Sequence, residues 1–234
     1  MDVIFVKQEN MGNYGKVASG HVYSAHVKIT DISRHAKELI KIISDTSWIK
    51  RLGAVEQASF SARANRTIDK LVNDIFAKVN DVITEEFGEY MISSTAQRTL
   101  EKHLKHTSIP LAELLKEKVS GNPGFDFHTE SNSNLICFGE AKYSGTSNPH
   151  GHALTQIGKF INLQKDIAEL VTLKSFVTSS AAQNAISGSK AYVAAFSVNN
   201  KSPLKVISNA LRSHLIDPLL SYPELYIIGV EVQC

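Results

Sequence analysis

Two neighbouring stretches decide the fold of this chain: Gly124-Phe-Asp-Phe-His-Thr-Glu130 and Leu135-Ile-Cys-Phe-Gly-Glu-Ala-Lys-Tyr143. Both are short and rich in apolar and aromatic residues, and a polar gap separates them, which is typical of two strands in a β-hairpin. Charged side chains interrupt both strands at interior positions: Asp126 in the first, and Glu140 and Lys142 in the second. The sequence therefore predicts a hairpin that carries three charged groups within an otherwise apolar sheet.

The second strand is expected to have two different faces, because side chains alternate between the faces of a strand. Glu140 and Lys142 fall on one face together with Phe138. The other face carries only small side chains, which leave room for a helix to pack closely: Cys137, Gly139 and Ala141.

The three charged groups point to metal chemistry. Carboxylates and an ammonium group in buried strands cost free energy unless something pairs them, and a hard divalent cation is the obvious partner. Asp126 and Glu140 can hold Mg²⁺ and still leave it several waters and a phosphate oxygen. Lys142 can orient or deprotonate a water, or stabilise negative charge on the reacting phosphate. These residues therefore predict metal-dependent hydrolysis of a phosphodiester.

The register of the hairpin is a testable part of this prediction. If the connection were a four-residue loop, residue 126 would pair with residue 139 and point away from Glu140. A shared cation requires residue 126 opposite residue 140, and hence a three- or five-residue loop or a bulge. We predict this second register.

Composition excludes several classes of protein. The 234 residues are 43% hydrophobic and 21% charged, as in an ordinary globular chain, and no apolar run is long enough to span a bilayer. The N-terminus lacks the basic-then-apolar pattern of a signal peptide, and two cysteines do not make a disulfide framework, so we expect a cytoplasmic protein. The net charge of +2 is small, so any surface for nucleic acid must be a local patch.

Hydrophobic periodicity along the rest of the chain predicts an α/β fold in two parts. A mainly helical N-terminal region, regulatory or partner-binding, is expected over residues 1–108, with an extended segment at 2–30 and helices from 31, at 48–52, over 57–80 and over 93–106. A core with a mixed sheet is expected over 109–234, with helices at 110–118, 152–174 and 204–220, strands at 191–198 and 225–232, and a flexible connector at 179–190.

Gly-Phe-Asp126 and Gly-Glu140-Ala-Lys142, followed by a helix with Gln156, resemble the PD-(D/E)xK nuclease superfamily. The resemblance implies a DNA-cleaving enzyme in which Asp126 and Glu140 bind Mg²⁺, with Mn²⁺ able to substitute, and Lys142 is catalytic. It also implies that a preceding helix contributes another glutamate, for which we prefer Glu113 to Glu117. Some members carry Gln-x-x-x-Tyr on the following helix; here the Gln matches, as Gln156, and is expected to orient substrate or water.

The same two segments also resemble, more narrowly, the nuclease subunits of Hachiman-type bacterial anti-phage defence. That resemblance implies an effector that works beside a helicase partner and is restrained by it until foreign or damaged DNA is sensed. Residue 160, where the superfamily pattern has Tyr, is Phe and is expected to lie in the core.

Two functions from other classes are alternatives. One is a sequence-specific restriction endonuclease with the same chemistry, acting as a homodimer. The other is a non-catalytic nucleic-acid-binding or assembly module on the same fold. A zinc site built from His103, His106 and the cysteines is not expected, because neither cysteine has close ligand neighbours in the sequence.

Basic residues and further polar residues allow more than one interpretation. Arg98, Lys102, Lys105 and His106 share one helical region and can follow a phosphate backbone or be a solvated face; both remain open. For a second set we expect a solvated face: Arg63, Arg66 and Lys70. His128 and Glu130 share a face with Asp126, so either can touch the metal or the scissile phosphate. The more common roles of such residues are to support the site or to lie near the solvated end of the hairpin.

Overall fold

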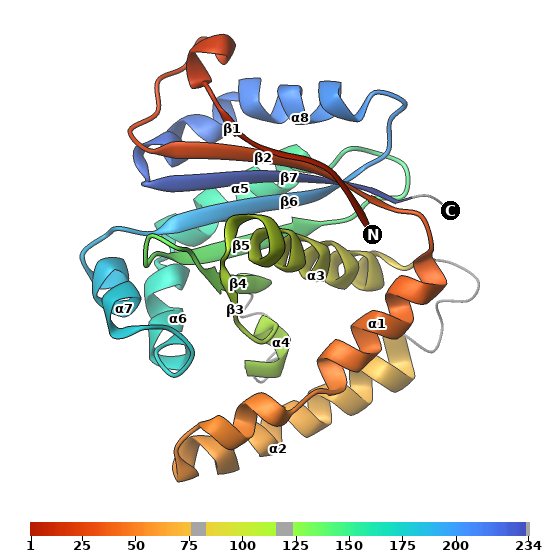
Figure 1. Ribbon diagram of the computed structural model, residues 1–234, viewed down its shortest axis with the longest axis vertical. Helices are drawn as coiled ribbons and strands as arrows, with labels where there is room; N and C mark the ends of the chain where they lie inside the picture. The colour runs from red at the N-terminus through yellow and green to blue at the C-terminus, as the bar shows by residue number, and fades with distance from the viewer. Residues whose placement is uncertain (76–82, 116–123, 233–234) are drawn as a thin grey trace.

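The computed structural model describes residues 1–75, 83–115 and 124–232 (Figure 1). The described residues form a seven-stranded mixed sheet in the order β1-β2-β7-β6-β5-β4-β3. Strands β2, β7, β6 and β5 run parallel to one another, while β1 at one edge and β4 and β3 at the other are antiparallel to their neighbours. The strands are β1 (Asp2–Glu9), β2 (His21–Ile29), β3 (Thr107–Ser108), β4 (Phe127–Glu130), β5 (Ile136–Lys142), β6 (Ala191–Val198) and β7 (Glu224–Val232).

Helices cover both faces of the sheet, which confirms the predicted α/β class (Figure 1). Helix α3 (Glu85–Leu104) packs on one face against β4 to β7, while α5 (His150–Asn162) and α8 (Pro203–Arg212) pack on the other. The remaining helices are α1 (Ile32–Ser44), α2 (Ala54–Lys70), α4 (Ala112–Leu115), α6 (Lys165–Leu173) and α7 (Ser179–Ile186). None of the described helices combines the length and the apolar character needed to cross a bilayer.

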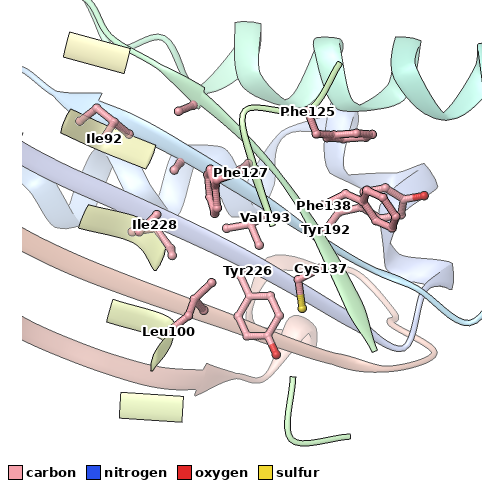
Figure 2. Close-up of a cluster of buried hydrophobic side chains, with 14 of the residues drawn as sticks. Ile92, Leu100, Phe125, Phe127, Cys137, Phe138, Tyr192, Val193, Tyr226 and Ile228 are labelled. Atoms are coloured by element: carbon pink, nitrogen blue, oxygen red, sulfur yellow. The ribbon is translucent and has the colours of Figure 1, made fainter. Parts of the chain in front are cut away.

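The sheet carries apolar groups on both faces, because its central strands are covered from both sides. All eight residues of β6 are buried. Figure 2 shows Phe127, Ile92 of α3 and Ile228 of β7 in one buried cluster with Phe125 and Phe138. The ring centroid of Phe125 lies 5.2 Å from those of both Phe138 and Phe160, so the prediction that Phe160 belongs to the core is confirmed.

The small residues of β5 are needed where they stand. A Cβ atom at Gly139 would lie 2.3 Å from the ring of Phe127. The room on this face of β5 is therefore filled in part by the opposite strand of the hairpin, and α3 packs above it.

The first 30 residues belong to the same sheet as the C-terminal strands. The predicted extended segment forms β1 and β2, and β2 pairs in parallel with β7 over its whole length, from His21 beside Glu224 to Ile29 beside Val232. Helix α3, which also precedes residue 109, lies on the sheet. The boundary expected at residues 108/109 therefore does not divide the sheet, because a parallel pairing between distant segments leaves no mark in local sequence.

Several helix boundaries differ from those expected. The helix expected at 93–106 begins at Glu85, where the hydroxyl of Thr84 accepts the N–H of Phe87 (3.2 Å) as an N-cap. The helix expected over 152–174 is broken into α5 and α6 at Gln164, whose φ is +53°. The helix expected over 204–220 is divided into α8, which ends at Arg212, and a separate 3-10 helix over His214–Ser221.

The connector expected at 179–190 instead begins with a helix, α7, in which the hydroxyl of Thr178 accepts the N–H of Ala181 (3.2 Å). This stretch is rich in serine, alanine and glycine, a composition that suggested a flexible connector. The N-cap residue Thr178 is the sequence signal that indicates a helix here. The helix expected at 57–80 is described as α2 followed by one wider turn at Leu71–Ile75. Of the helix expected at 110–118, the structure describes α4 at Ala112–Leu115. Residues 76–80 of the first helix and 116–118 of the second lie outside the described residues.

Candidate functional site

The hairpin has the predicted register. Strands β4 and β5 pair from Phe127 beside Gly139 to Glu130 beside Ile136, which leaves a five-residue connection. Continued by one residue, this pairing brings Asp126 to the level of Glu140. The N–H of Asp126 donates to the carbonyl of Gly139 (2.9 Å), and its Oδ2 accepts the N–H of Ala141 (2.8 Å). The carboxylate of Asp126 is thereby held beside the second strand.

Lys142 links the hairpin to helix α3. Its Nζ lies 2.8 Å from Oε1 of Glu140 and 3.1 Å from Oε1 of Glu89, so one ammonium group contacts two carboxylates. Burial alone would lower the pKa of Lys142, but the charges of Glu140, Asp126 and Glu89 outweigh burial and raise it. The two acids and the lysine that the sequence singled out thus lie together, and Glu89 joins them.

Glu140 is the most constrained of these groups. Its side chain is fully buried, and no described residue donates a hydrogen bond to its Oε2. Oε1 of Glu140 is paired with the Lys142 ammonium group at 2.8 Å. Burial, and then the charge of Asp126, raises the pKa of Glu140 well above its usual range. Burial also raises the pKa of Glu89, against the opposing charge of Lys142.

A divalent cation fits this arrangement. Three carboxylates lie close enough to a single ammonium group for each to raise its pKa: Glu89, Asp126 and Glu140. One ammonium group cannot balance three neighbouring carboxylates, and buried charge is unfavourable unless it is compensated; carboxylate oxygens are the ligands that Mg²⁺ prefers. Asp126 and Glu140 are therefore suited to hold Mg²⁺, as the sequence predicts, with Glu89 at the same place.

Of the two candidates for the helix glutamate expected from the resemblance, the structure describes one. Glu113 of α4 lines a cavity of about 40 Å³ together with Asp126 and Glu89, which keeps it as a prediction for a further ligand. Glu117 lies outside the described residues. Tyr90 also lines this cavity; its burial, and then the negative charges of Glu113 and other nearby acids, raises its pKa.

Glu89 was not identified from the sequence. The signal that could have found it is the N-cap Thr84 followed by two acidic residues, which starts the helix early enough to include Glu89. Its neighbour Gly88 lets α3 approach the end of β5, because a Cβ atom there would lie 2.1 Å from the ring of Tyr143. This close approach brings Glu89 to Lys142.

Gln156 lies on α5, which packs against β5 and β6 from the other side of the sheet. Its side chain is half-buried, and within the described ranges it forms no hydrogen bond or ion pair with the carboxylates. The role of Gln156 in orienting substrate or water stays a prediction.

A carboxylate of α6 contacts a backbone N–H before Asp126 and a side chain after it. Oε1 of Glu169 accepts the N–H of Phe125 (3.0 Å), and Oε2 lies 2.6 Å from Nε2 of the fully buried His128. His128 therefore helps to position the hairpin next to Asp126 through its contact with Glu169. Glu130 does not belong to it, because its carboxylate accepts the N–H (2.8 Å) and the hydroxyl (2.6 Å) of Thr178 at the start of α7.

The sequence matches no protein-family model and no curated protein.

A second cluster of ligand-type side chains lies deeper in the core. Ligand atoms of His106, Cys137 and Glu224 lie within 4.8 Å of one another, so the expectation that neither cysteine has ligand neighbours was wrong for Cys137. These residues are far apart in sequence: His106 precedes β3, Cys137 lies on β5 and Glu224 on β7. His106 already contacts the hydroxyls of Thr129 (2.9 Å) and Tyr226 (3.1 Å), and Tyr226 donates to Glu224 (2.6 Å).

Protonation also favours a hydrogen-bonded core network for this cluster. Burial lowers the pKa of His106 to about 4 and raises the pKa of Cys137, so the imidazole and the thiol are both neutral at pH 7. A metal would require the thiolate and would break hydrogen bonds that are already satisfied. We assign these residues to core packing.

Two buried histidines make the fold sensitive to acid. Burial lowers the pKa of both His35 and His106 from 6.5 to about 4, so the folded state binds fewer protons than the unfolded state between these values. Above pH 6.5 these two histidines do not lower the free energy of unfolding. As the pH drops from 6.5 towards 4, each of them lowers it by up to about 1.4 kcal/mol per pH unit. Urea denaturation between pH 7 and 4 measures this, and we expect a shallower loss in His35→Gln and His106→Gln. Equal slopes in both variants and the unsubstituted protein would contradict the assignment.

A larger cavity lies away from the carboxylates. It measures about 760 Å³ and is lined by residues of α1, α3 and the segment before α7, including Trp48, Gln97 and Phe176. None of the four charged residues described above lines it. The volume of a cavity therefore does not identify the candidate site. The site is identified by the charged side chains that converge there.

Proposed function

We propose that this chain is a Mg²⁺-dependent deoxyribonuclease that hydrolyses phosphodiester bonds of DNA. The observation that carries the proposal is the convergence of Glu89, Asp126, Glu140 and Lys142 at one end of the β4–β5 hairpin. The resemblance of the hairpin segments to the PD-(D/E)xK superfamily supports DNA as the substrate. When bound, Mg²⁺ would neutralise a phosphate and lower the pKa of a coordinated water.

The roles of the protein groups follow from their contacts. Asp126 and Glu140 hold the cation, and Asp126 is oriented for this by the N–H of Ala141. Lys142 lies next to both acids as an ammonium group, where it can orient water and stabilise charge that develops on the phosphate. Glu89 holds the other side of the ammonium group and keeps it at the site.

The biological setting is proposed from the resemblance alone. The likeness to nuclease subunits of Hachiman-type defence favours a cytoplasmic anti-phage effector that acts with a helicase partner. The isolated chain would then cut DNA weakly or without sequence preference. Cutting at a defined site by the isolated chain would instead favour a homodimeric restriction endonuclease.

Cleavage assays with and without Mg²⁺ test the proposal. We expect Mg²⁺-dependent cutting of supercoiled, linear or single-stranded DNA, and loss of at least a hundredfold of the rate in Glu140→Ala/Lys142→Ala, in line with typical losses on removing a catalytic group. Glu101→Ala/Lys102→Ala is the matched control, because it removes one exposed acid and one exposed base from α3. It is expected to cut at the normal rate.

A cellular assay covers the case in which a partner restrains the isolated chain. Phage plating on cells that express the chain with its partner should lose protection in the double variant but not in the control. Unchanged protection in the double variant, together with no Mg²⁺-dependent cutting by the purified protein, would leave the non-catalytic module as the remaining function.

A further inference from the structure

One face of α2 is basic and borders the candidate site. Arg63, Arg66 and Lys70 are spaced three and four residues apart, so their side chains share one face of the helix. All three line a cavity of about 180 Å³. The sequence alone favoured a solvated helix face for these residues, but their position next to the acids suggests a more specific role.

The basic cavity and the acidic cavity share a wall. Glu86, Tyr90 and Glu113 line both the cavity beside α2 and the smaller one that includes Asp126. Among the described residues, these three side chains therefore connect the cavity lined by the cations of α2 with the cavity lined by Asp126 and Glu89.

Arg63 fixes α2 in this position. One guanidinium nitrogen donates to the carbonyl of Leu115 in α4 (2.9 Å) and the other to the hydroxyl of Ser59 (2.8 Å), and the group lies 4.6 Å from the ring centroid of Phe60. Arg63 is thus half-buried and structural. Arg66 and Lys70 are exposed and lie four residues apart, about 6 Å along the helix axis.

We propose that Arg66 and Lys70 bind the phosphate backbone of the DNA strand whose neighbouring phosphate is cleaved at Asp126 and Glu140. This inference rests on the proposed function. A site built from carboxylates repels a polyanion, so cations beside it are needed to hold the strand. Lys and Arg side chains that neutralise phosphates release counterions and supply most of the affinity for a backbone of any sequence.

The other basic set is a weaker candidate for this role. Arg98 lines the cavity of about 760 Å³ that lies away from the carboxylates, and His106 is buried in the core network. Neither residue lies at the candidate site, whereas α2 borders it.

DNA binding without metal tests the inference, because EDTA prevents Mg²⁺-dependent cleavage while binding is measured. The assay is fluorescence anisotropy of fluorescein-labelled single-stranded and duplex 30-mers with the full chain. We expect Arg66→Ala/Lys70→Ala to weaken binding about tenfold at low salt and to reduce the slope of log K against log[salt] by about 1.4–1.8, since each phosphate contact contributes about 0.7–0.9. Alanine favours helix at these exposed positions, so α2 should stay folded.

The matched control is Lys37→Ala/Lys41→Ala on α1, which removes two exposed cations at the same spacing. It should keep the affinity and the slope. Equal losses in both variants, no loss in either, or no binding by the unsubstituted chain would each overturn the inference. Binding that depends on α2 without Mg²⁺-dependent cutting would refute the proposed function instead, and cutting without α2-dependent binding would refute only this inference.

Discussion

Glu140→Gln is expected to raise the melting temperature of the metal-free protein at pH 8 and to abolish its stabilisation by Mg²⁺. The folded state holds Glu140 fully buried, and burial and Asp126 raise its pKa well above the usual range. The folded state therefore binds more protons than the unfolded state above pH 4.5, and the favourable contribution of the protonated group is lost as the pH rises through the folded pKa. Glutamine has nearly the same shape and no charge, so it removes this cost.

Thermal unfolding in EDTA from pH 5 to 8 measures the effect. Each unit of raised pKa corresponds to about 1.4 kcal/mol, and about 1 kcal/mol moves the melting temperature of a chain of this size by about 2–4 °C. The difference between variant and unsubstituted protein should shrink at pH 5. Mg²⁺ at a hundred times its dissociation constant should add about 2.7 kcal/mol to the unsubstituted protein and nothing to the variant.

Glu101→Gln is the control, because Glu101 is an exposed glutamate of α3 outside the carboxylate cluster. It should leave the melting temperature and the response to Mg²⁺ unchanged. A Glu140→Gln variant that melts lower at every pH, or that gains as much from Mg²⁺ as the unsubstituted protein, would show that Glu140 is a structural group and not a metal ligand.

The part of the site that the sequence predicts is the part made by local structure. Asp126, Glu140 and Lys142 lie on two consecutive strands, and alternation of side chains plus the length of the connection determine which of them meet. Buried charge in apolar strands is a signal that a sequence shows directly. The register of the hairpin could be predicted because a cation shared by Asp126 and Glu140 requires residue 126 to lie opposite residue 140.

Glu89 and the basic face of α2 depend on non-local packing. Glu89 contacts a lysine 53 residues away, and the contact forms only because α3 crosses the sheet near the end of β5. Arg66 and Lys70 are spaced like the charged residues of an ordinary solvated helix face. Their proposed role in DNA binding follows from the position of α2 beside the candidate site. Periodicity predicts that a helix exists and which face is apolar, but not where that helix lies on the sheet.

The fold shows the same limit. The extended segment at the N-terminus was predicted as strands, but its parallel pairing with β7 joins segments about two hundred residues apart. A two-part chain was a natural expectation because the intervening residues are helical. In the structure, strands from both ends of the chain belong to one sheet.

Lys142→Ala is expected to lower the rate of Mg²⁺-dependent cleavage by about a hundred- to ten-thousandfold, the range typical of a lost catalytic group. Lys142→Arg should keep a measurable part of that activity. The charges of Glu140, Asp126 and Glu89 raise the pKa of Lys142, so it carries a proton at pH 7–8 and acts as a cation rather than as a base. Arginine keeps the positive charge and can still orient a water, but its larger planar group fits less well.

The comparison of the two variants distinguishes these roles. If Lys142 removed a proton from water, arginine would be as inactive as alanine, because a guanidinium group does not deprotonate at these pH values. Initial rates at saturating Mg²⁺ on a plasmid substrate measure the difference, with Lys102→Ala as the control for loss of a lysine. Equal activity of Lys142→Ala and the unsubstituted protein would remove Lys142 from the chemistry. Equal inactivity of the alanine and arginine variants, with unchanged melting temperatures, would make it the base and would contradict the role argued from its neighbours.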